Sequence, residues 1–162
     1  MEKQIKFNGF LKEAMQNYPK ESCAFLYSDK PLEQDGKWFV FSIKNISEEP
    51  EHFWIPDKKE VAKIKKKARD MNLIKIGNIH THPIPESFES CIGEDFIEEN
   101  FKPSDTDLKF AKKFNDIIRG IIVIDKKAIY GIKFHDMFGR KIDVVVEDKE
   151  LNSEGKFFSS QP

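Results

Sequence analysis

The feature that most constrains the fold is an alternation of short apolar runs with segments of helical period. Three segments carry apolar residues every three or four positions and are predicted to be helices: residues 7–18, a segment that begins at Asp57, and residues 104–114. Runs rich in Ile, Val, Phe and Trp predict strands at residues 22–28, 37–46, 74–82, 117–125, 128–134 and 141–147. Helices and strands alternate early, and strands dominate the end. This order predicts an α/β or α+β fold in which helices flank one mixed sheet.

The length and charge of the chain bound its class. It has 162 residues, with 27 Lys and Arg against 28 Asp and Glu, and a net charge of −1. This length predicts one domain over residues 1–150, and we expect the polar tail, residues 151–162, to be disordered. The balanced charge argues against a nucleic-acid partner, and no apolar run approaches the roughly 20 residues of a membrane span. Two cysteines, Cys23 and Cys91, and an N-terminus unlike a signal peptide predict a cytoplasmic location.

Two histidines end one of the predicted strands, in the sequence His80-Thr81-His82-Pro83. Because side chains alternate along a strand, His80 and His82 face the same side. Two imidazoles at this spacing can share one metal ion. The alternative is a pair of polar residues at an exposed strand end, and this short pattern taken alone favours the alternative.

A second candidate lies at the start of a predicted helix, in Ser104-Asp105-Thr106-Asp107. Ser104 and Asp107 have the spacing of a capping box, which is a purely structural explanation. A helix N-terminus can also present a carboxylate rigidly, so Asp107 could join His80 and His82 around a zinc ion. Three protein ligands would leave a fourth position for water, as in catalytic zinc sites.

A catalytic zinc site needs a base, and Glu21 is the candidate. It lies between the first predicted helix and the first predicted strand. Taken alone, one Glu among 28 acidic residues is more simply a surface carboxylate. His52 and His135 have no partner pattern and are predicted to lie at the surface.

Together these residues resemble the JAMM (MPN) family of zinc metalloproteases. The family pattern is an early Glu, then H-[ST]-H-P, then S-x-x-D, which matches Glu21, His80 to Pro83, and Ser104 to Asp107. The resemblance spans about residues 5–134. It implies a JAMM/MPN-like mixed sheet flanked by helices, similar to the cytidine deaminase fold.

The resemblance also implies roles. His80, His82 and Asp107 would bind zinc, Glu21 would be the general base, and Ser104 would stabilise the oxyanion. The implied reaction is hydrolysis of a peptide or isopeptide bond, often after the C-terminal tail of ubiquitin or a ubiquitin-like protein. Short single domains like this one resemble the prokaryotic branch, whose members include enzymes acting on ubiquitin-like sulfur carriers and peptidases that accompany phage tail proteins.

Two other classes stay open. One is a non-catalytic MPN-type scaffold that binds proteins, although such members usually lack one of the ligands that are all present here. The other is a zinc deaminase, although the C-x-x-C of deaminase sites is absent.

The chain departs from the family pattern between the histidines and Ser104. Here 21 residues separate His82 from Ser104, which is 14 more than in H-x-H-x7-S-x-x-D. The additional segment, residues 84–102, is acidic and could be a lid, a substrate-selecting loop or disordered. We expect it to pack near the metal cleft and to limit access. Glu86, Glu89 or Cys91 could then occupy the fourth zinc position and hold the enzyme shut.

Overall fold

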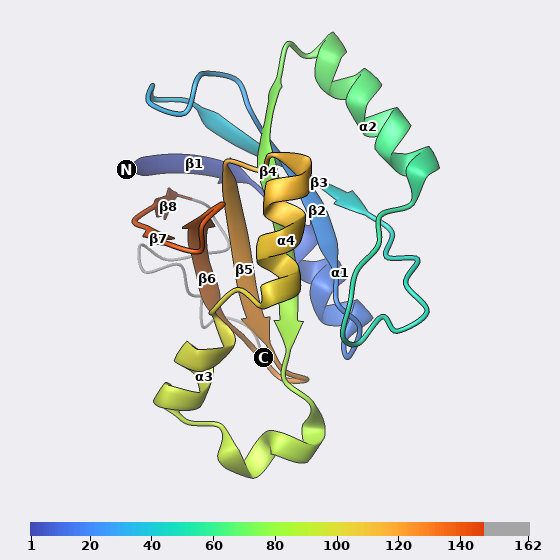
Figure 1. The fold of residues 1–162 in the computed structure, drawn as a ribbon, viewed down its shortest axis with the longest axis vertical. Helices are drawn as coiled ribbons and strands as arrows, with labels where there is room; N and C mark the ends of the chain where they lie inside the picture. Colours follow the sequence, from blue (N-terminus) through green and yellow to red (C-terminus); the bar gives the residue numbers. More distant parts are fainter. Residues whose placement is uncertain (148–162) are drawn as a thin grey trace.

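One mixed sheet of eight strands organises the part of the chain that the computed structural model describes, residues 1–147 (Figure 1). The strands are β1 (Glu2–Lys6), β2 (Cys23–Ser28), β3 (Lys37–Ile43), β4 (Ile74–Pro83), β5 (Ile118–Ile124), β6 (Ile129–Asp136), β7 (Lys141–Ile142) and β8 (Val145–Glu147). Their order in the sheet is β7-β6-β5-β4-β2-β3-β1-β8. The pairs β1–β3, β1–β8 and β4–β5 are parallel, and the other pairs are antiparallel.

Helices flank this sheet, as the sequence predicts. They are α1 (Phe10–Asn17), α2 (Lys58–Asp70), the 3-10 helix η1 (Glu86–Cys91), α3 (Glu94–Asn100) and α4 (Asp105–Phe114). Asp57 caps α2 by accepting a hydrogen bond from the main-chain N–H of Lys59. The carboxylate of Glu60 does not complete a capping box with Asp57, because it accepts from the main-chain N–H of Lys44 instead.

The sheet curls around its larger core. Trp38 on β3 and Phe134 on β6 are separated by three strands in the sheet order, yet their rings lie edge to face with centroids 5.6 Å apart. Phe10 and Leu11 of α1 are fully buried in the same cluster of side chains. Contact between such distant strands requires curvature, which confirms the predicted fold as a curled mixed sheet with helices against it.

The other face of the sheet carries the three helices α2, α3 and α4 (Figure 1). Helix α2 packs through Ile64 and Ala68 on side chains of β2 and β3. Helix α4 lies in front of β4 and runs alongside β4 and β5, and α3 lies toward the carboxyl ends of these strands (Figure 1). Phe101, which follows α3, is buried against Ile121 and Val123 of β5. His80 and His82 therefore project toward a space bordered by these elements.

Three sequence-based expectations differ from the structure. The first helix begins at Phe10 rather than residue 7, and β1 was not predicted. Residues 141–147 form two short strands, β7 and β8, at opposite edges of the sheet instead of one strand. Residues 83–103, which show no sequence period, contain η1 and α3. The predicted tail, residues 151–162, lies outside the described residues.

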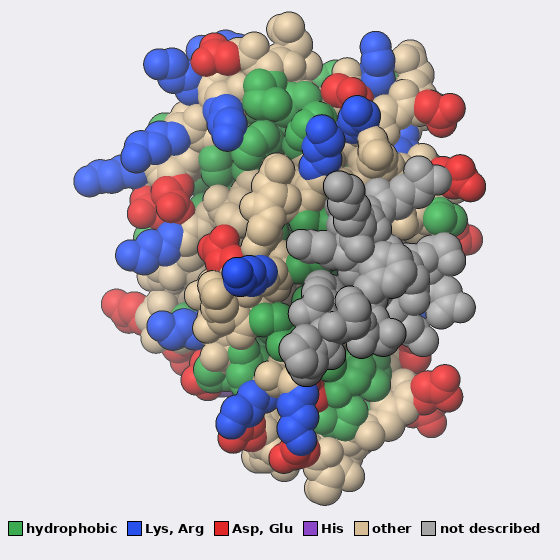
Figure 2. Space-filling view, turned by 180° about the vertical axis from the view of Figure 1, so that it is seen from behind, with side chains coloured by type: hydrophobic (Ala, Val, Ile, Leu, Met, Phe, Trp, Pro, Cys, Tyr) green, Lys and Arg blue, Asp and Glu red, His purple; other side chains and the backbone are tan. Residues whose placement is uncertain are grey.

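The surface seen from behind Figure 1 mixes both signs of charge. Acidic and basic side chains are interspersed there, with hydrophobic side chains between them (Figure 2). This distribution agrees with the net charge of −1. Within residues 1–147, no helix has the length and apolar character needed to cross a membrane.

Candidate metal centre

Three metal-binding side chains converge beside the end of β4. The Nε2 atom of His80 lies 3.2 Å from Asp107 Oδ1, and the Nε2 atom of His82 lies 3.2 Å from Asp107 Oδ2. The two Nε2 atoms are 3.2 Å apart. All three ligand atoms lie within 4.8 Å of one another, and among residues 1–147 no fourth His, Cys, Asp or Glu joins them. The structure thus brings together the three residues that the sequence nominates as metal ligands.

Asp107 reaches this point because it belongs to the first turn of α4. The side chain of Ser104 accepts a hydrogen bond from the main-chain N–H of Asp107 over 3.1 Å. The main-chain N–H of Ser104 donates to Asp107 Oδ2 over 2.9 Å, which completes a capping box. The structural explanation and the ligand explanation of this motif are therefore compatible, because the cap fixes the carboxylate that faces the imidazoles.

Hydrogen bonds on the far side of each ring determine which nitrogen faces Asp107. His80 Nδ1 lies 3.3 Å from Asn78 Oδ1, and His82 Nδ1 lies 2.6 Å from the main-chain oxygen of Asn100. Carbonyl oxygens can only accept, so in the neutral form of either ring the hydrogen is on Nδ1 and the lone pair is on Nε2. Two imidazole lone pairs and a carboxylate then point at one another. This arrangement is unfavourable without a cation between them, so the donor set fits a bound metal ion.

The donors suit a divalent first-row metal ion, zinc among them. Two imidazole nitrogens and one carboxylate oxygen are a common three-ligand set for catalytic Zn²⁺, which keeps its fourth position open. Burial lowers the pKa of His80 and outweighs the opposing effect of Asp107. Burial alone would raise the pKa of Asp107, but the neighbouring His80 and His82 hold that pKa well below its usual range. Neutral imidazole and ionised carboxylate are the forms that bind a metal.

A buried arginine supports the same centre. Arg119 on β5 is 2% exposed and donates to the main-chain oxygen of Asp107. Its guanidinium lies 3.8 Å from Asp107 Oδ1 and 3.6 Å from Asp116 Oδ2. The sequence analysis did not select Arg119, Asp116, Asn78 or Asn100. Strand alternation places Asn78 on the face of His80, but only the tertiary structure brings the others close.

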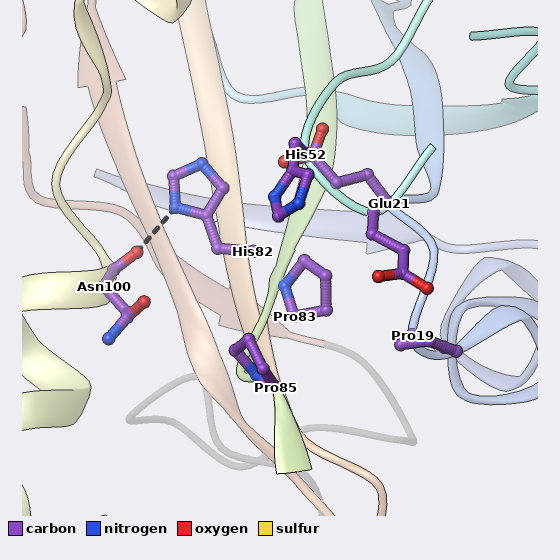
Figure 3. A pocket seen from close by; sticks show the side chains of 8 residues that line it. Pro19, Glu21, His52, His82, Pro83, Pro85 and Asn100 are labelled. Atoms are coloured by element: carbon purple, nitrogen blue, oxygen red, sulfur yellow. Dashed lines mark hydrogen bonds between the residues drawn. The ribbon is translucent and has the colours of Figure 1, made fainter. Parts of the chain in front are cut away.

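Glu21 lies beside the metal centre because of the pairing of β2 with β4. Cys23 pairs with His80, and the main-chain N–H of Thr81 donates to Ser22 over 3.0 Å. Continuing this antiparallel register places Glu21 opposite His82. Both side chains line a cleft of about 250 Å³, called here the Glu21 cleft. Figure 3 shows the His82 imidazole on one side of the cleft and the Glu21 carboxylate on the other.

The carboxyl group of Glu21 is in an unusual environment. It is 8% exposed, and burial together with the nearby Asp107 raises its pKa from 4.5 to about 9. A carboxyl whose pKa is shifted by burial and a like charge inside a cleft is a common property of catalytic acids and bases. The surface-carboxylate alternative for Glu21 therefore does not match its position.

The loop before α2 holds Glu21 in place and adds a histidine to the cleft. The side chain of Asn45 donates to the main-chain oxygen of Glu21 over 2.9 Å, and the main-chain N–H of Glu21 donates to Pro50 over 2.6 Å. His52 lines the Glu21 cleft, so it is part of the site's wall and not only a surface residue (Figure 3). The prediction for His135 was wrong, because His135 on β6 is buried.

The inserted segment, residues 84–102, lies beside the cleft. Pro85 and Asn100 line the cleft. Glu86 pairs with Lys126 over 3.2 Å, and Glu89 pairs with Lys127 over 3.0 Å, both on the β5–β6 turn. Cys91 is exposed. The idea that one of these three side chains fills a fourth metal position is therefore wrong, because ion pairs direct the two carboxylates to the β5–β6 turn and Cys91 faces solvent.

Comparison with known proteins identifies the class to which this fold and site belong, the JAB/MPN domains. Residues 6–90 match the model of a family described as prokaryotic homologs of the JAB domain, and the chain belongs to this family. The match includes Glu21, His80 and His82, while Asp107 lies beyond it. The resemblance inferred from the motifs is thereby confirmed. No curated protein matches the chain.

Solved structures confirm the fold over nearly the whole chain. A JAB1/MPN domain protein from Archaeoglobus fulgidus has a TM-score of 0.53 at 16% identity, covering 91% of this chain and 98% of that one. A protein from Desulfitobacterium hafniense has a TM-score of 0.53 at 17% identity, covering 92% and 94%. A protein from Salinibacter ruber has a TM-score of 0.56 at 18% identity, covering 96% and 98%. At these identities the similarity shows the fold alone.

Proposed function

We propose that this chain is a cytoplasmic, zinc-dependent peptidase or isopeptidase. The observation that carries the proposal is the convergence of His80 Nε2, His82 Nε2 and an Asp107 oxygen within 4.8 Å, with the hydrogen of each imidazole directed away. The JAB/MPN family includes both zinc isopeptidases and non-catalytic members. Retention of all three ligands, together with a buried carboxyl in the adjoining cleft, supports the catalytic alternative.

The roles of the residues follow from their positions. Zinc held by His80, His82 and Asp107 would lower the pKa of a water molecule to about 7, which makes hydroxide available near neutral pH. The charge of a bound metal ion would favour the ionised form of Glu21, which would then accept the proton of the attacking water and pass it to the leaving amine. The Oγ of Ser104 accepts a hydrogen bond from Asp107, so its own hydrogen is free to be donated to the oxyanion of the tetrahedral intermediate.

A second cavity supports a protein substrate. An apolar groove of about 530 Å³, called here the α2–α4 groove, runs between these helices and is lined by Phe25, Trp54, Phe110 and Phe114, among others. The centroid of the Trp54 ring lies 5.8 Å from that of His80, so one wall of the groove adjoins a metal ligand. An apolar groove beside a hydrolytic site suits an extended segment such as the C-terminal tail of a ubiquitin-like protein.

Metal analysis of the wild type beside His82→Ala tests the metal centre. We expect about one zinc per wild-type chain and strongly reduced zinc in the variant, because two ligands hold zinc much less well than three. Circular dichroism checks that the variant is folded. A wild-type chain that binds no zinc when zinc is supplied would contradict the proposal.

Cleavage of fusions tests the reaction. Ubiquitin-like proteins extended at their C-terminus by a peptide or by an isopeptide-linked lysine are incubated with the zinc-loaded chain. We expect cleavage directly after the tail and none with Glu21→Gln. A chain that binds zinc, binds these proteins and cleaves none of them is a scaffold. Cleavage restricted to other extended peptides favours a peptidase such as those that accompany phage tails.

A further inference from the structure

The inserted segment, residues 84–102, is firmly attached to the sheet. Ile92, Phe96 and Ile97 pack on a buried cluster that contains Phe101 and Val123. The rings of Phe88 and Phe96 are stacked with centroids 5.7 Å apart. This apolar anchoring fixes the position of α3 relative to β5 and β6.

Ion pairs hold the outer side of the same segment. Besides the pairs of Glu86 and Glu89 with lysines of the β5–β6 turn, Glu98 of α3 pairs with Lys133 of β6 over 2.6 Å. These pairs are largely exposed, and exposed pairs contribute little stability each. These three pairs show that Glu86, Glu89 and Glu98 face the β5–β6 hairpin rather than the metal ligands.

The end of α3 meets a metal ligand. Asn100 is the last residue of the helix, so its main-chain oxygen has no partner within the helix. It lies 2.6 Å from His82 Nδ1, which satisfies the oxygen and places the hydrogen of the imidazole on Nδ1 (Figure 3). The side chain of Asn100 donates back to the main-chain oxygen of Phe96 over 2.8 Å and so maintains this last turn.

We propose that the inserted segment is a structural part of the metal centre, in which α3 holds the Asn100 carbonyl as the group that orients His82. Asn100 is a positioning residue, because its carbonyl contacts the imidazole and not the metal. Without it, the ring of His82 can rotate and either nitrogen can carry the hydrogen. The proposal rests on the proposed zinc-dependent function, and it gives the insertion a role that differs from a lid or a substrate loop.

The test replaces residues 86–99 with a Gly-Ser linker and measures zinc affinity by competition with a chromophoric chelator. Loss of a partner that orients a ligand typically costs 10- to 100-fold in metal affinity, and we expect about that loss here. The control is the double variant Glu86→Gln, Glu89→Gln, which removes two ion pairs and leaves α3 docked. We expect the control to bind zinc within about twofold of wild type, since exposed ion pairs contribute little.

The second measurement is the tautomer of His82 in the metal-free protein, from long-range ¹H–¹⁵N NMR spectra. In wild type we expect a hydrogen on Nδ1 bonded to the Asn100 carbonyl, whether or not Nε2 also carries a hydrogen toward Asp107. In the shortened chain we expect a mixture for His82 and an unchanged spectrum for His80, whose partner is Asn78. This NMR measurement requires neither bound zinc nor enzymatic activity. A wild type without zinc binding would therefore defeat the proposed function and still leave the orientation of His82 tested.

Two results would overturn the inference: a shortened chain with wild-type zinc affinity, or one with an unchanged His82 spectrum. Unchanged affinity with faster cleavage of an unstructured tail would instead show that the segment is a lid. If the shortened chain does not fold, Phe96→Ala combined with Ile97→Ala in the full chain loosens α3, and the same two measurements decide.

Discussion

The side-chain amide of Asn78 donates to Asp116 Oδ2 over 2.7 Å, and both side chains are buried. Because the side-chain nitrogen of Asn78 makes this bond, the side-chain oxygen of Asn78 faces His80 Nδ1. Asp116 is held in turn by Arg119 and by Lys75, whose ammonium lies 3.4 Å from Asp116 Oδ1. The orientation of His80 therefore depends on a carboxylate 36 positions later in the chain.

These contacts from Asp116 through Asn78 to His80 predict that Asn78→Leu weakens metal binding. Leucine fills a similar volume and offers no acceptor to His80, so zinc affinity should fall by about 10- to 100-fold. Asp116 keeps its two cationic neighbours in this variant. Chelator competition measures the effect, and Ile76→Val on the same strand is the control. Equal affinities in Asn78→Leu and Ile76→Val would show that Asn78 does not orient the ligand.

Replacing the proposed base should separate catalysis from metal binding. Glu21→Gln keeps the shape of the side chain and loses its ability to accept a proton. We expect zinc content and folding to be retained while the cleavage rate falls by about a hundredfold or more. Glu48→Gln, at an exposed position in the loop that follows β3, should keep the wild-type rate. Loss of zinc in Glu21→Gln would mean that Glu21 supports the metal rather than the proton transfer.

The raised pKa of Glu21 also predicts a pH-dependent stability in the metal-free protein. The folded state holds the proton up to about pH 9, while the unfolded state releases it near 4.5. The unfolded state thus binds fewer protons in this window, and the free energy of unfolding falls as pH rises from about 4.5 to 9. One such group contributes a slope of at most about 1.4 kcal/mol per pH unit.

Urea unfolding of the chelator-treated protein at pH 5.5 and pH 8 checks this prediction. Glu21→Gln cannot ionise, so its stability should decrease less over the same interval, and it should exceed wild type at pH 8. If the free energy of unfolding changes equally with pH in the two proteins, ionisation of Glu21 does not destabilise the folded state.

Strands β4 and β5 approach so closely at Gly77 that a side chain has no room there. A Cβ atom at this position would lie 1.7 Å from the main-chain oxygen of Ile118, which cannot move without disturbing the parallel ladder. We expect Gly77→Ala to destabilise the protein by about 3 kcal/mol or more, within the range of severe single substitutions. Thermal unfolding measures it. Gly93→Ala, where no atom lies within 4 Å of the added Cβ, loses only a favourable N-cap residue of α3 and should cost about 1 kcal/mol or less.

The α2–α4 groove predicts an effect on substrate binding alone. Phe114 lines the groove and is 53% exposed, so Phe114→Ser should leave stability and zinc content nearly unchanged. If the groove holds the substrate, KM for a protein substrate should rise by about tenfold, equivalent to about 1.4 kcal/mol. Phe138→Ser removes a similarly exposed ring outside the groove and should leave KM unchanged. Equal KM values for the two variants would place the substrate elsewhere.

Local patterns in the sequence were sufficient for much of the fold and for the nomination of the site. The alternation of side chains puts His80 and His82 on one face of β4 whatever surrounds the strand. The capping box of Ser104 and Asp107 is likewise a local interaction, and it fixes the start of α4. The longer helices and the central strands carry periodic apolar residues, so their type could be predicted from the sequence.

Other elements depend on partners that are distant in the sequence. Strand β1 buries only Lys3 and Ile5, and it is a strand because β3 and β8 pair with its two edges. The split of residues 141–147 into β7 and β8 has the same cause, since each half pairs with a different edge of the sheet. Periodicity in a window of a few residues carries no information about such pairings.

The sequence by itself was sufficient to nominate His80, His82 and Asp107 as a metal-binding set and Glu21 as the carboxylate beside them. The tertiary structure decided how they are held. Asp116 orients Asn78, the carbonyl of Asn100 lies against His82, and Glu86 and Glu89 of the insertion pair with lysines of the β5–β6 turn. These contacts join residues that are 18 to 40 positions apart. Their geometry comes from strand pairing and from the packing of α3 on β5, both of which depend on the whole fold and not on any local pattern.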